Sequence, residues 1–238
     1  MNNYLFYLFC FLPSLIWLIF YLRRDNRPES VLMILRVFLS GIIFAFLALL
    51  LELSFDFSIA VLGLKKFLIF FFLTLFTTSL IEEYLKYLAV RFNVFKSSEL
   101  DQPFDLVLYM IISALGFVVL ENILILANYH SILTIEKVFW LLMIRFLFAV
   151  FSHTLFSAIF GFFLILSFNF LPKRRFFFIL GLLISSFLHT FYNLFIIQLT
   201  HWGIFFLLLI FLSILFIFVL IIIRKLKKLK SLCFLRKN

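Results

Sequence analysis

The sequence predicts an all-α, polytopic transmembrane helix bundle with about seven spans, and three observations support this fold class. Hydrophobic residues make up 66% of the 238 residues, whereas soluble domains are about 45–50% apolar. Mean hydropathy is +1.24, and only 13% of the residues are charged. The apolar residues also fall into runs of about 20, the length that an α-helix needs to cross a bilayer. Lipid is therefore expected to be the solvent for most of the surface.

Seven apolar runs are the candidate spans. They cover roughly residues 4–22, 31–53, 67–90, 105–128, 138–168, 176–199 and 203–223. The fifth run is longer than a bilayer requires, which predicts a helix that is tilted or that extends beyond the membrane. The first run has no charged segment before it and is followed by Arg23 and Arg24, so we interpret it as an uncleaved span and not as a signal peptide.

The segments between the spans alternate in charge. One set of loops, together with residues 224–238, carries about 15 Lys and Arg residues, whereas the other set carries only Lys65, Lys66 and Lys137. The positive-inside rule then places the N-terminus outside and the C-terminus inside, which agrees with an odd number of spans. This asymmetry accounts for the net charge of +10 without a nucleic-acid partner.

The domain organisation is predicted to be simple. Residues 1–238 form a single integral membrane domain, within which 67–199 are the helix core that carries the polar motifs. Residues 224–238 are predicted to be a basic cytoplasmic tail that can lie on anionic headgroups. Because the loops are too short to form a soluble catalytic domain, any activity is expected to lie within the bilayer.

The third span contains two adjacent acidic residues and a lysine. Each charge near a helix centre costs about 2.5–3.5 kcal/mol on insertion scales, so such residues are functional candidates by default. Glu82 and Lys86 are four residues apart and share a helix face, which predicts an ion pair. The pair alone can serve to fix helix packing, but Glu83 adds a second carboxylate that packing does not require. Two such groups can act as general base and acid.

The fourth span carries Glu121 and Asn122 deep within it, and Gly116 is expected to let a neighbouring helix approach closely. The alternative to a functional role for Glu121 is a structural one, in which its carboxyl group is protonated and hydrogen-bonds a neighbouring helix. Arg145 in the fifth span and Arg36 in the second are expected either to snorkel to the interface or to pair with a carboxylate.

The fifth and sixth spans each contain a histidine. His153, Ser157 and Gly161 follow one another at intervals of four, so they form one ridge on which the two small residues suit tight helix packing. His189 and Asn193 share a face of the sixth span. They can hydrogen-bond each other as an interhelical clamp or point together at a bound oxygen, since Asn is a suitable oxyanion donor.

These four segments, in this order, resemble the PrsW family of intramembrane proteases, which is related to the superfamily of CAAX prenyl endopeptidases. The family pattern consists of an EExxK helix, a GFxxxEN helix, an HxxxxxxxG helix and an HxxxN helix. The matching residues here are Glu82-Glu83-Tyr84-Leu85-Lys86, Gly116-Phe117 with Glu121-Asn122, His153 with Gly161, and His189 with Asn193. The resemblance covers about residues 75–195, and Tyr192 stands where many relatives have Trp.

The resemblance implies a multi-pass protease of the bacterial cytoplasmic membrane that hydrolyses peptide bonds of membrane-protein substrates. It implies that Glu82 is the general base, that Glu83 or Lys86 tunes it, and that His153 helps to hold the water or a metal. His189 and Asn193 would stabilise the oxyanion. The full candidate catalytic set is Glu82, Glu83, Lys86, Glu121, His153, His189 and Asn193.

The resemblance also bears on the cofactor. Members of the family are commonly called metalloproteases, and Glu121, His153 and His189 are the implied ligands of a zinc ion, since a carboxylate with two imidazoles is a suitable donor set. The superfamily also admits a metal-free glutamate mechanism, and the sequence leaves both open.

Two other functional classes compete with a protease. Buried Glu, Lys and His residues also mark the ion pathways of proton-coupled or ion-coupled transporters, although no inverted repeat and no pair of broken helices is recognisable. The third possibility is a non-catalytic scaffold that binds other membrane proteins, in which the polar residues are structural.

Overall fold

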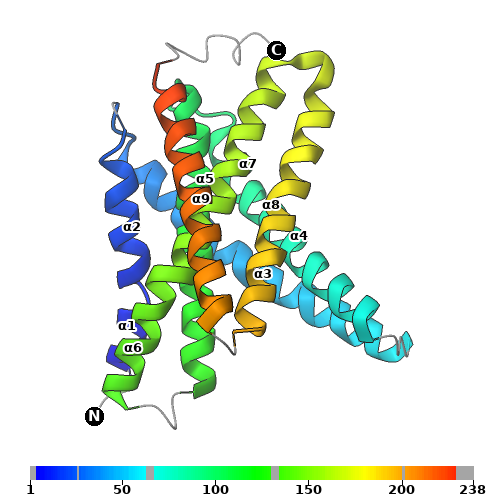
Figure 1. Cartoon of the computed structure of the whole chain (residues 1–238). Helices are drawn as coiled ribbons and strands as arrows, with labels where there is room; N and C mark the ends of the chain where they lie inside the picture. Colours follow the sequence, from blue (N-terminus) through cyan, green and yellow to red (C-terminus); the bar gives the residue numbers. More distant parts are fainter. Residues whose placement is uncertain (1–3, 26, 63–66, 130–133, 200–201, 229–238) are drawn as a thin grey trace.

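The structure is a computed structural model that describes residues 4–25, 27–62, 67–129, 134–199 and 202–228. All regular secondary structure in these residues is helical (Figure 1). The elements are α1 (Tyr4–Phe9), α2 (Leu12–Leu22), α3 (Val31–Leu62), α4 (Phe67–Val94), α5 (Pro103–Tyr129), α6 (Ile135–Arg145), the π-helix η1 (Phe146–Val150), α7 (Phe151–Asn169), the 3₁₀-helix η2 (Leu171–Lys173), α8 (Arg174–Ile197) and α9 (Trp202–Leu226).

Each of the seven predicted spans corresponds to one helical unit, which confirms the predicted fold class. Five units are long and apolar enough to cross a membrane: Val31–Phe55, Pro103–Asn128, Glu136–Asn169, Leu171–Ile197 and Trp202–Leu226. The first unit is shorter, with an apolar helical stretch of Tyr7–Leu22. The remaining unit is α4, whose second half carries the charged residues Glu82, Glu83, Lys86 and Arg91.

Three helical units depart from the simple spans. The first is broken at Cys10 and Phe11, and α2 then begins with Pro13 in its first turn, where the missing N–H of proline costs no helical hydrogen bond. The second span was predicted to end at 53, but α3 continues to Leu62. The long fifth unit, Glu136–Asn169, contains the π-helix η1 between α6 and α7, and such segments are frequent at functional sites.

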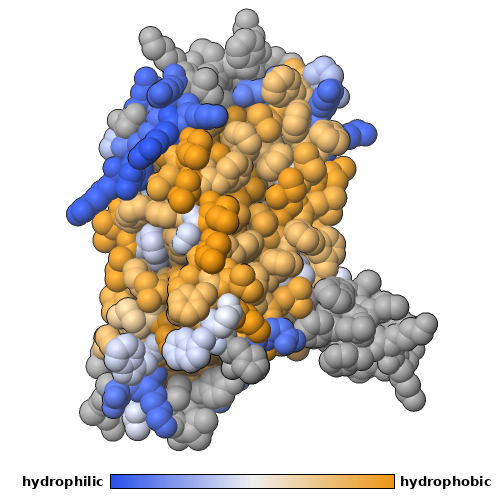
Figure 2. All heavy atoms as spheres, viewed as in Figure 1, coloured by the Kyte–Doolittle hydropathy of each residue, from blue (hydrophilic) through white to orange (hydrophobic). Residues whose placement is uncertain are grey.

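The bundle has two polar ends separated by an apolar belt (Figure 2). The basic end, at the top of Figure 1, is formed by the loop 23–30, the loop 95–102, the segment 170–175 and the end of α9. The starts of α1, α6 and α9 lie at the opposite end, where Lys137 is exposed. Lys65, Lys66 and residues 229–238 of the predicted tail lie outside the described residues, and residues 224–226 form the last turn of α9.

Helix α5 is the centre of the bundle, and α3, α7, α2 and α4 all pack against it. Its side chains from Leu106 to Ile112 are fully buried. Two glycines allow α3 and α5 to touch through their backbones. A Cβ atom at Gly116 would lie 2.0 Å from the carbonyl oxygen of Phe38, and one at Gly41 would lie 2.3 Å from that of Ser113. The predicted close approach at Gly116 is therefore confirmed.

Gly116→Leu is expected to lower the stability of the bundle by about 1–3 kcal/mol or more, because overpacking forces backbone shifts in a dense interior. The measurement is the thermal midpoint of the purified protein in detergent. Gly203→Leu is the control, since nothing lies within 4 Å of a Cβ atom at Gly203. Equal midpoints for the two variants would contradict the packing argument.

The loop between α2 and α3 is fastened to the start of α5. The Tyr109 hydroxyl donates a hydrogen bond to Glu29, and the Ser30 hydroxyl donates to Glu99 at 2.7 Å. Burial, together with the nearby carboxylates of Asp105 and Asp25, raises the pKa of Glu29 to about 8 against the lowering effect of the Tyr109 hydrogen bond. The folded protein therefore keeps a proton on Glu29 that the unfolded chain releases.

A raised carboxyl pKa makes stability depend on pH in a definite direction. The contribution of protonated Glu29 is complete below its ordinary pKa of 4.5 and is lost as the pH rises through about 8, because the unfolded state binds fewer protons over that window. Glu29→Gln is expected to flatten the decline of the thermal midpoint between about pH 5 and about pH 8. Glu136→Gln at an exposed site is the control, and parallel curves for wild type and Glu29→Gln would reject the assignment.

Candidate active site

The charged residues of α4 form a compact buried cluster. Lys86 is fully buried, and its ammonium nitrogen lies 2.7 Å from Glu83 Oε1 and 3.3 Å from Glu82 Oε2. The predicted pairing of Glu82 with Lys86 is confirmed. The shorter contact is nevertheless with Glu83, because residues three apart on a helix also lie on neighbouring faces. One cation therefore serves two adjacent carboxylates.

Two histidines from other helices complete the cluster. His153 of α7 places Nδ1 3.0 Å from the Lys86 ammonium, and His189 of α8 places Nδ1 3.1 Å from Glu83 Oε1. The centroids of the two imidazole rings are 4.7 Å apart. Since α4 packs against α8 and α7 packs against α8, residues separated by up to 106 positions along the chain meet at one point.

The hydrogen bonds define which ring nitrogens carry protons. An ammonium group can only donate, so His153 Nδ1 accepts the bond from Lys86. A carboxylate can only accept, so His189 Nδ1 donates to Glu83. The His189 ring is held in place by Phe156, which stacks on it with centroids 5.2 Å apart.

The two adjacent carboxylates differ in their surroundings. Glu83 is fully buried and accepts hydrogen bonds from three donors, namely Lys86, His189 and the hydroxyl of Ser157, which lies 3.1 Å from Oε2. Glu82 is 9% exposed and has the 3.3 Å contact with Lys86 and a longer 3.9 Å approach to His189. Glu83 is thus fixed by its neighbours, whereas Glu82 keeps acceptor capacity.

A second group of polar residues extends the site towards the opposite end. Arg145, the last residue of α6, donates to Glu121 Oε2 at 3.2 Å and also to Asn122. The other oxygen of Glu121 is buried without a hydrogen-bond donor at normal distance and lies 3.5 Å from His153 Nε2. Of the two outcomes predicted for Arg145, pairing with a carboxylate is the one the structure has, whereas Arg36 is exposed.

The donor atoms for a metal ion converge at this site. Among the described residues, Glu82, His153 and His189 are buried and offer ligand atoms that all lie within 4.8 Å of one another. One carboxylate with two imidazoles is a donor set that zinc uses in catalytic sites, so the residues present fit such an ion. The metal ligands predicted from the sequence were Glu121, His153 and His189, with Glu121 in place of Glu82. The Oε1 atom of Glu121 lies beside His153 without a hydrogen bond, so it is also available as a ligand, and that set stays a prediction.

The remaining predicted residue, Asn193, is half-buried one turn beyond His189 on α8. Among the described contacts, His189 bonds to Glu83 and not to Asn193. Ser157 and Glu52 are the polar residues that sequence analysis missed. Ser157 was interpreted as a packing residue, although its hydroxyl bonds Glu83, and Glu52 of α3 acts electrostatically on Glu82. The available signal for Glu52 was an acidic residue within an apolar run.

Comparison with known proteins gives a consistent result. Residues 29–223 match a family described as PrsW family intramembrane metalloprotease, a longer stretch than the predicted 75–195. Protease PrsW of Geobacillus kaustophilus is 32% identical over 187 residues, which cover 77% of this chain and 76% of the relative. Protease PrsW of Bacillus subtilis is 29% identical over 191 residues, which cover 77% of this chain and 78% of the relative. No solved structure matches the chain.

Several sequence-based predictions are confirmed by these matches. The protein is an integral, multi-pass membrane protein of a bacterial membrane, and it is a protease whose substrates are membrane proteins. The alternatives of a transporter and a non-catalytic scaffold receive no support. The family match covers most of the length, and it agrees with the order of the four motifs and with the buried Glu/His cluster that they form. The chain therefore belongs to the PrsW family of intramembrane metalloproteases.

Proposed function

We propose that Glu82 is the general base of peptide-bond hydrolysis and that Glu83 and Lys86 hold the site in its reactive arrangement. The observation that carries this assignment is the unequal bonding of the two carboxylates. Glu83 accepts from three donors, so its lone pairs are engaged. Glu82 has one 3.3 Å contact with Lys86 and some exposure, so it can accept a proton from a water molecule.

The proton and bond changes follow from these positions. Glu82 takes a proton from water as the water oxygen attacks the carbonyl carbon of the scissile peptide bond. In the metal-free form of this mechanism, His189 and Asn193, one turn apart on α8, would stabilise the negative charge on the carbonyl oxygen. The protonated Glu82 then gives its proton to the leaving nitrogen as the C–N bond breaks, which regenerates the carboxylate.

A metal ion is accommodated by the same side chains. We infer that His153 and His189 hold it together with the carboxylate of Glu121, whose Oε1 lies 3.5 Å from His153 Nε2, so that Glu82 keeps its role as the general base. Zinc, when bound, supplies Lewis-acid polarisation of the substrate carbonyl and of water. Lys86 lies beside this donor set, with its ammonium nitrogen 3.0 Å from Nδ1 of His153 and 2.7 Å from Glu83 Oε1.

The orientation of the molecule follows from the charges at its two ends. We propose that the basic end faces the cytoplasm, with the N-terminus outside and the C-terminus inside, since Lys and Arg are retained on that side. The motif-bearing helices lie within 67–199, which we propose as the catalytic core of one membrane domain. Substrate chains then reach the Glu/His cluster from within the bilayer.

Metal analysis of the purified protein, combined with proteolysis in proteoliposomes, tests the metal assignment. Wild type is expected to contain about one zinc ion per chain and to cleave a single-pass membrane-protein substrate, and a strong chelator is expected to remove both the metal and the activity. His189→Ala is expected to lose both. Ser185→Ala is the matched control, because the hydrogen bond of the Ser185 hydroxyl within the described part of the chain stays in its own helix, at Leu182. Full activity after complete metal removal would favour the metal-free mechanism.

A further inference from the structure

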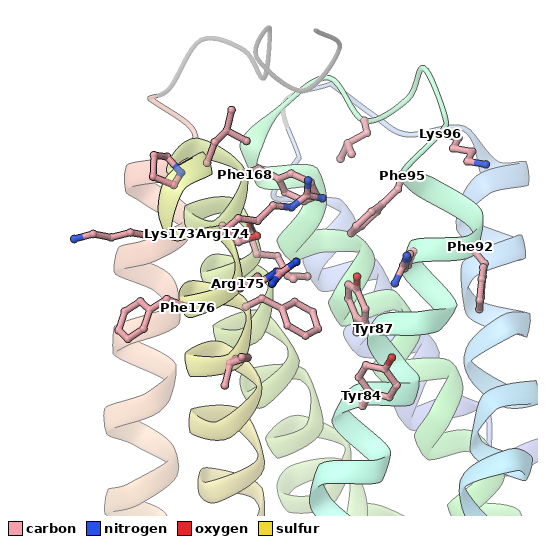
Figure 3. Close-up of a pocket in the computed structure, with 18 residues that line it drawn as sticks. Tyr84, Tyr87, Phe92, Phe95, Lys96, Phe168, Lys173, Arg174, Arg175 and Phe176 are labelled. Atoms are coloured by element: carbon pink, nitrogen blue, oxygen red, sulfur yellow. Dashed lines mark hydrogen bonds between the residues drawn. The ribbon is translucent and has the colours of Figure 1, made fainter. Parts of the chain in front are cut away.

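A groove of about 1540 Å³ lies between α4 and α8 at the basic end of the bundle (Figure 3). Its walls come from the last three turns of α4, the following segment up to Leu100, the end of α7 and the first turns of α8. Tyr84, which directly follows Glu83 in the sequence, and Tyr87 also line it. The groove has no role in the chemistry described above.

Five cations line this groove: Arg91, Lys96, Lys173, Arg174 and Arg175. Its lining residues include no Asp or Glu, and the ion pairs found among the described residues leave all five without a carboxylate partner. Figure 3 shows Arg174 and Arg175 pointing from α8 towards the wall that carries Tyr87, whereas Lys173 points away. The two arginines and Arg91 therefore concentrate positive charge that nothing in the described protein neutralises.

The start of α8 adds to this positive potential. Its first turn contains no acidic residue and its N-cap makes no side-chain hydrogen bond. A helix N-terminus carries a partial positive charge that favours anions and disfavours cations. Placing Lys173, Arg174 and Arg175 at that position is unfavourable for the protein alone. An anion bound between these groups would remove the conflict.

Exposed apolar side chains border the groove beside its arginines. Phe92 is 70% exposed, Phe176 59% and Ile179 53%, and these side chains border the groove on the two helices. Aromatic residues at this level are typical of the boundary between headgroups and hydrocarbon. A molecule that fits the groove and its rim thus needs an anionic head for the arginines and an apolar body for the exposed side chains beside them.

We propose that this groove binds an anionic phospholipid, with its phosphate between Arg91, Arg174 and Arg175 and its acyl chains along the exposed aromatic residues. Arginine side chains offer donors only, and a phosphate needs only donors. A peptide segment would also bring backbone N–H groups, which require acceptors in a membrane. The lining offers few acceptors besides the hydroxyls of Tyr84, Tyr87 and Ser167, so it suits a lipid better than a peptide.

The bound lipid would connect the basic ends of the two helices that carry Glu82 and His189. Its effect is a property of the folded protein and does not depend on proteolysis. Native mass spectrometry and thermal midpoints of the full chain in detergent, with dioleoyl phosphatidylglycerol or dioleoyl phosphatidylcholine added, test the proposal. Wild type is expected to retain phosphatidylglycerol and to be stabilised by it at concentrations roughly tenfold lower than for phosphatidylcholine.

Matched variants separate this site from the general positive charge of the surface. Arg174→Gln/Arg175→Gln is expected to lose the preference for phosphatidylglycerol, and Arg91→Gln on the opposite wall is expected to weaken it. Arg224→Gln/Lys225→Gln removes the same charge from exposed positions at the end of α9 and is expected to keep the preference. Equal loss in both double variants, no preference in wild type, or binding of a polyglutamate peptide in place of the lipid would each overturn the proposal.

Discussion

Glu82→Gln is expected to lower the rate of peptide-bond hydrolysis by about 10²–10⁴-fold while the fold is retained. Glutamine has nearly the shape of glutamate but cannot accept a proton from water. The contact of Glu82 with Lys86 is the longer of the two carboxylate contacts, at 3.3 Å against 2.7 Å for Glu83, so the fold depends less on Glu82. The measurement is single-turnover cleavage of a membrane-protein substrate in proteoliposomes.

The controls for this prediction use the neighbouring carboxylate and a distant one. Glu83→Gln removes a carboxylate that accepts hydrogen bonds from three donors, so it is expected to lower both the thermal midpoint and the rate. Glu136→Gln, at the exposed start of α6, is expected to change neither. A Glu82→Gln variant that cleaves within about threefold of the wild-type rate would remove Glu82 from the role of general base.

Lys86→Met is expected to destabilise the protein by about 3–5 kcal/mol, because removing one partner of a buried ion pair leaves an uncompensated charge. Lys86 contacts Glu82, Glu83 and His153, and its ammonium group also lies 4.7 Å from the centre of the Phe117 ring. The free energy of unfolding is measured by titration of the purified protein from mild detergent into denaturing detergent.

A double variant tests whether the loss arises from the charge. Glu83→Gln/Lys86→Met removes the closest carboxylate together with the cation, so its loss of stability is expected to be smaller than the sum of the two single losses. Lys137→Met is the control, since Lys137 is exposed at the start of α6. Additive losses for Glu83 and Lys86 would show that the two residues act independently, against the 2.7 Å contact.

Local spacing predicted part of the site. The i, i+4 relation of Glu82 and Lys86 was sufficient to predict their ion pair, because it depends only on helix geometry. The contacts of Arg145 with Glu121 and of Ser157 with Glu83 could not be derived in this way. Both join different helices, and they depend on how far each helix is rotated about its own axis.

The sequence by itself determined that this protein is a multi-pass helical membrane protein, because hydropathy adds up along the chain and needs no knowledge of neighbours. It also determined which polar residues are too costly to be incidental in those helices. Only the tertiary structure decided that His153 meets Lys86 and that His189 meets Glu83, and that Glu82 and Glu83 are unequal. Those outcomes depend on the packing of α4 and α7 against α5 and of α8 against both α4 and α7, because that packing sets the rotation and depth of each helix.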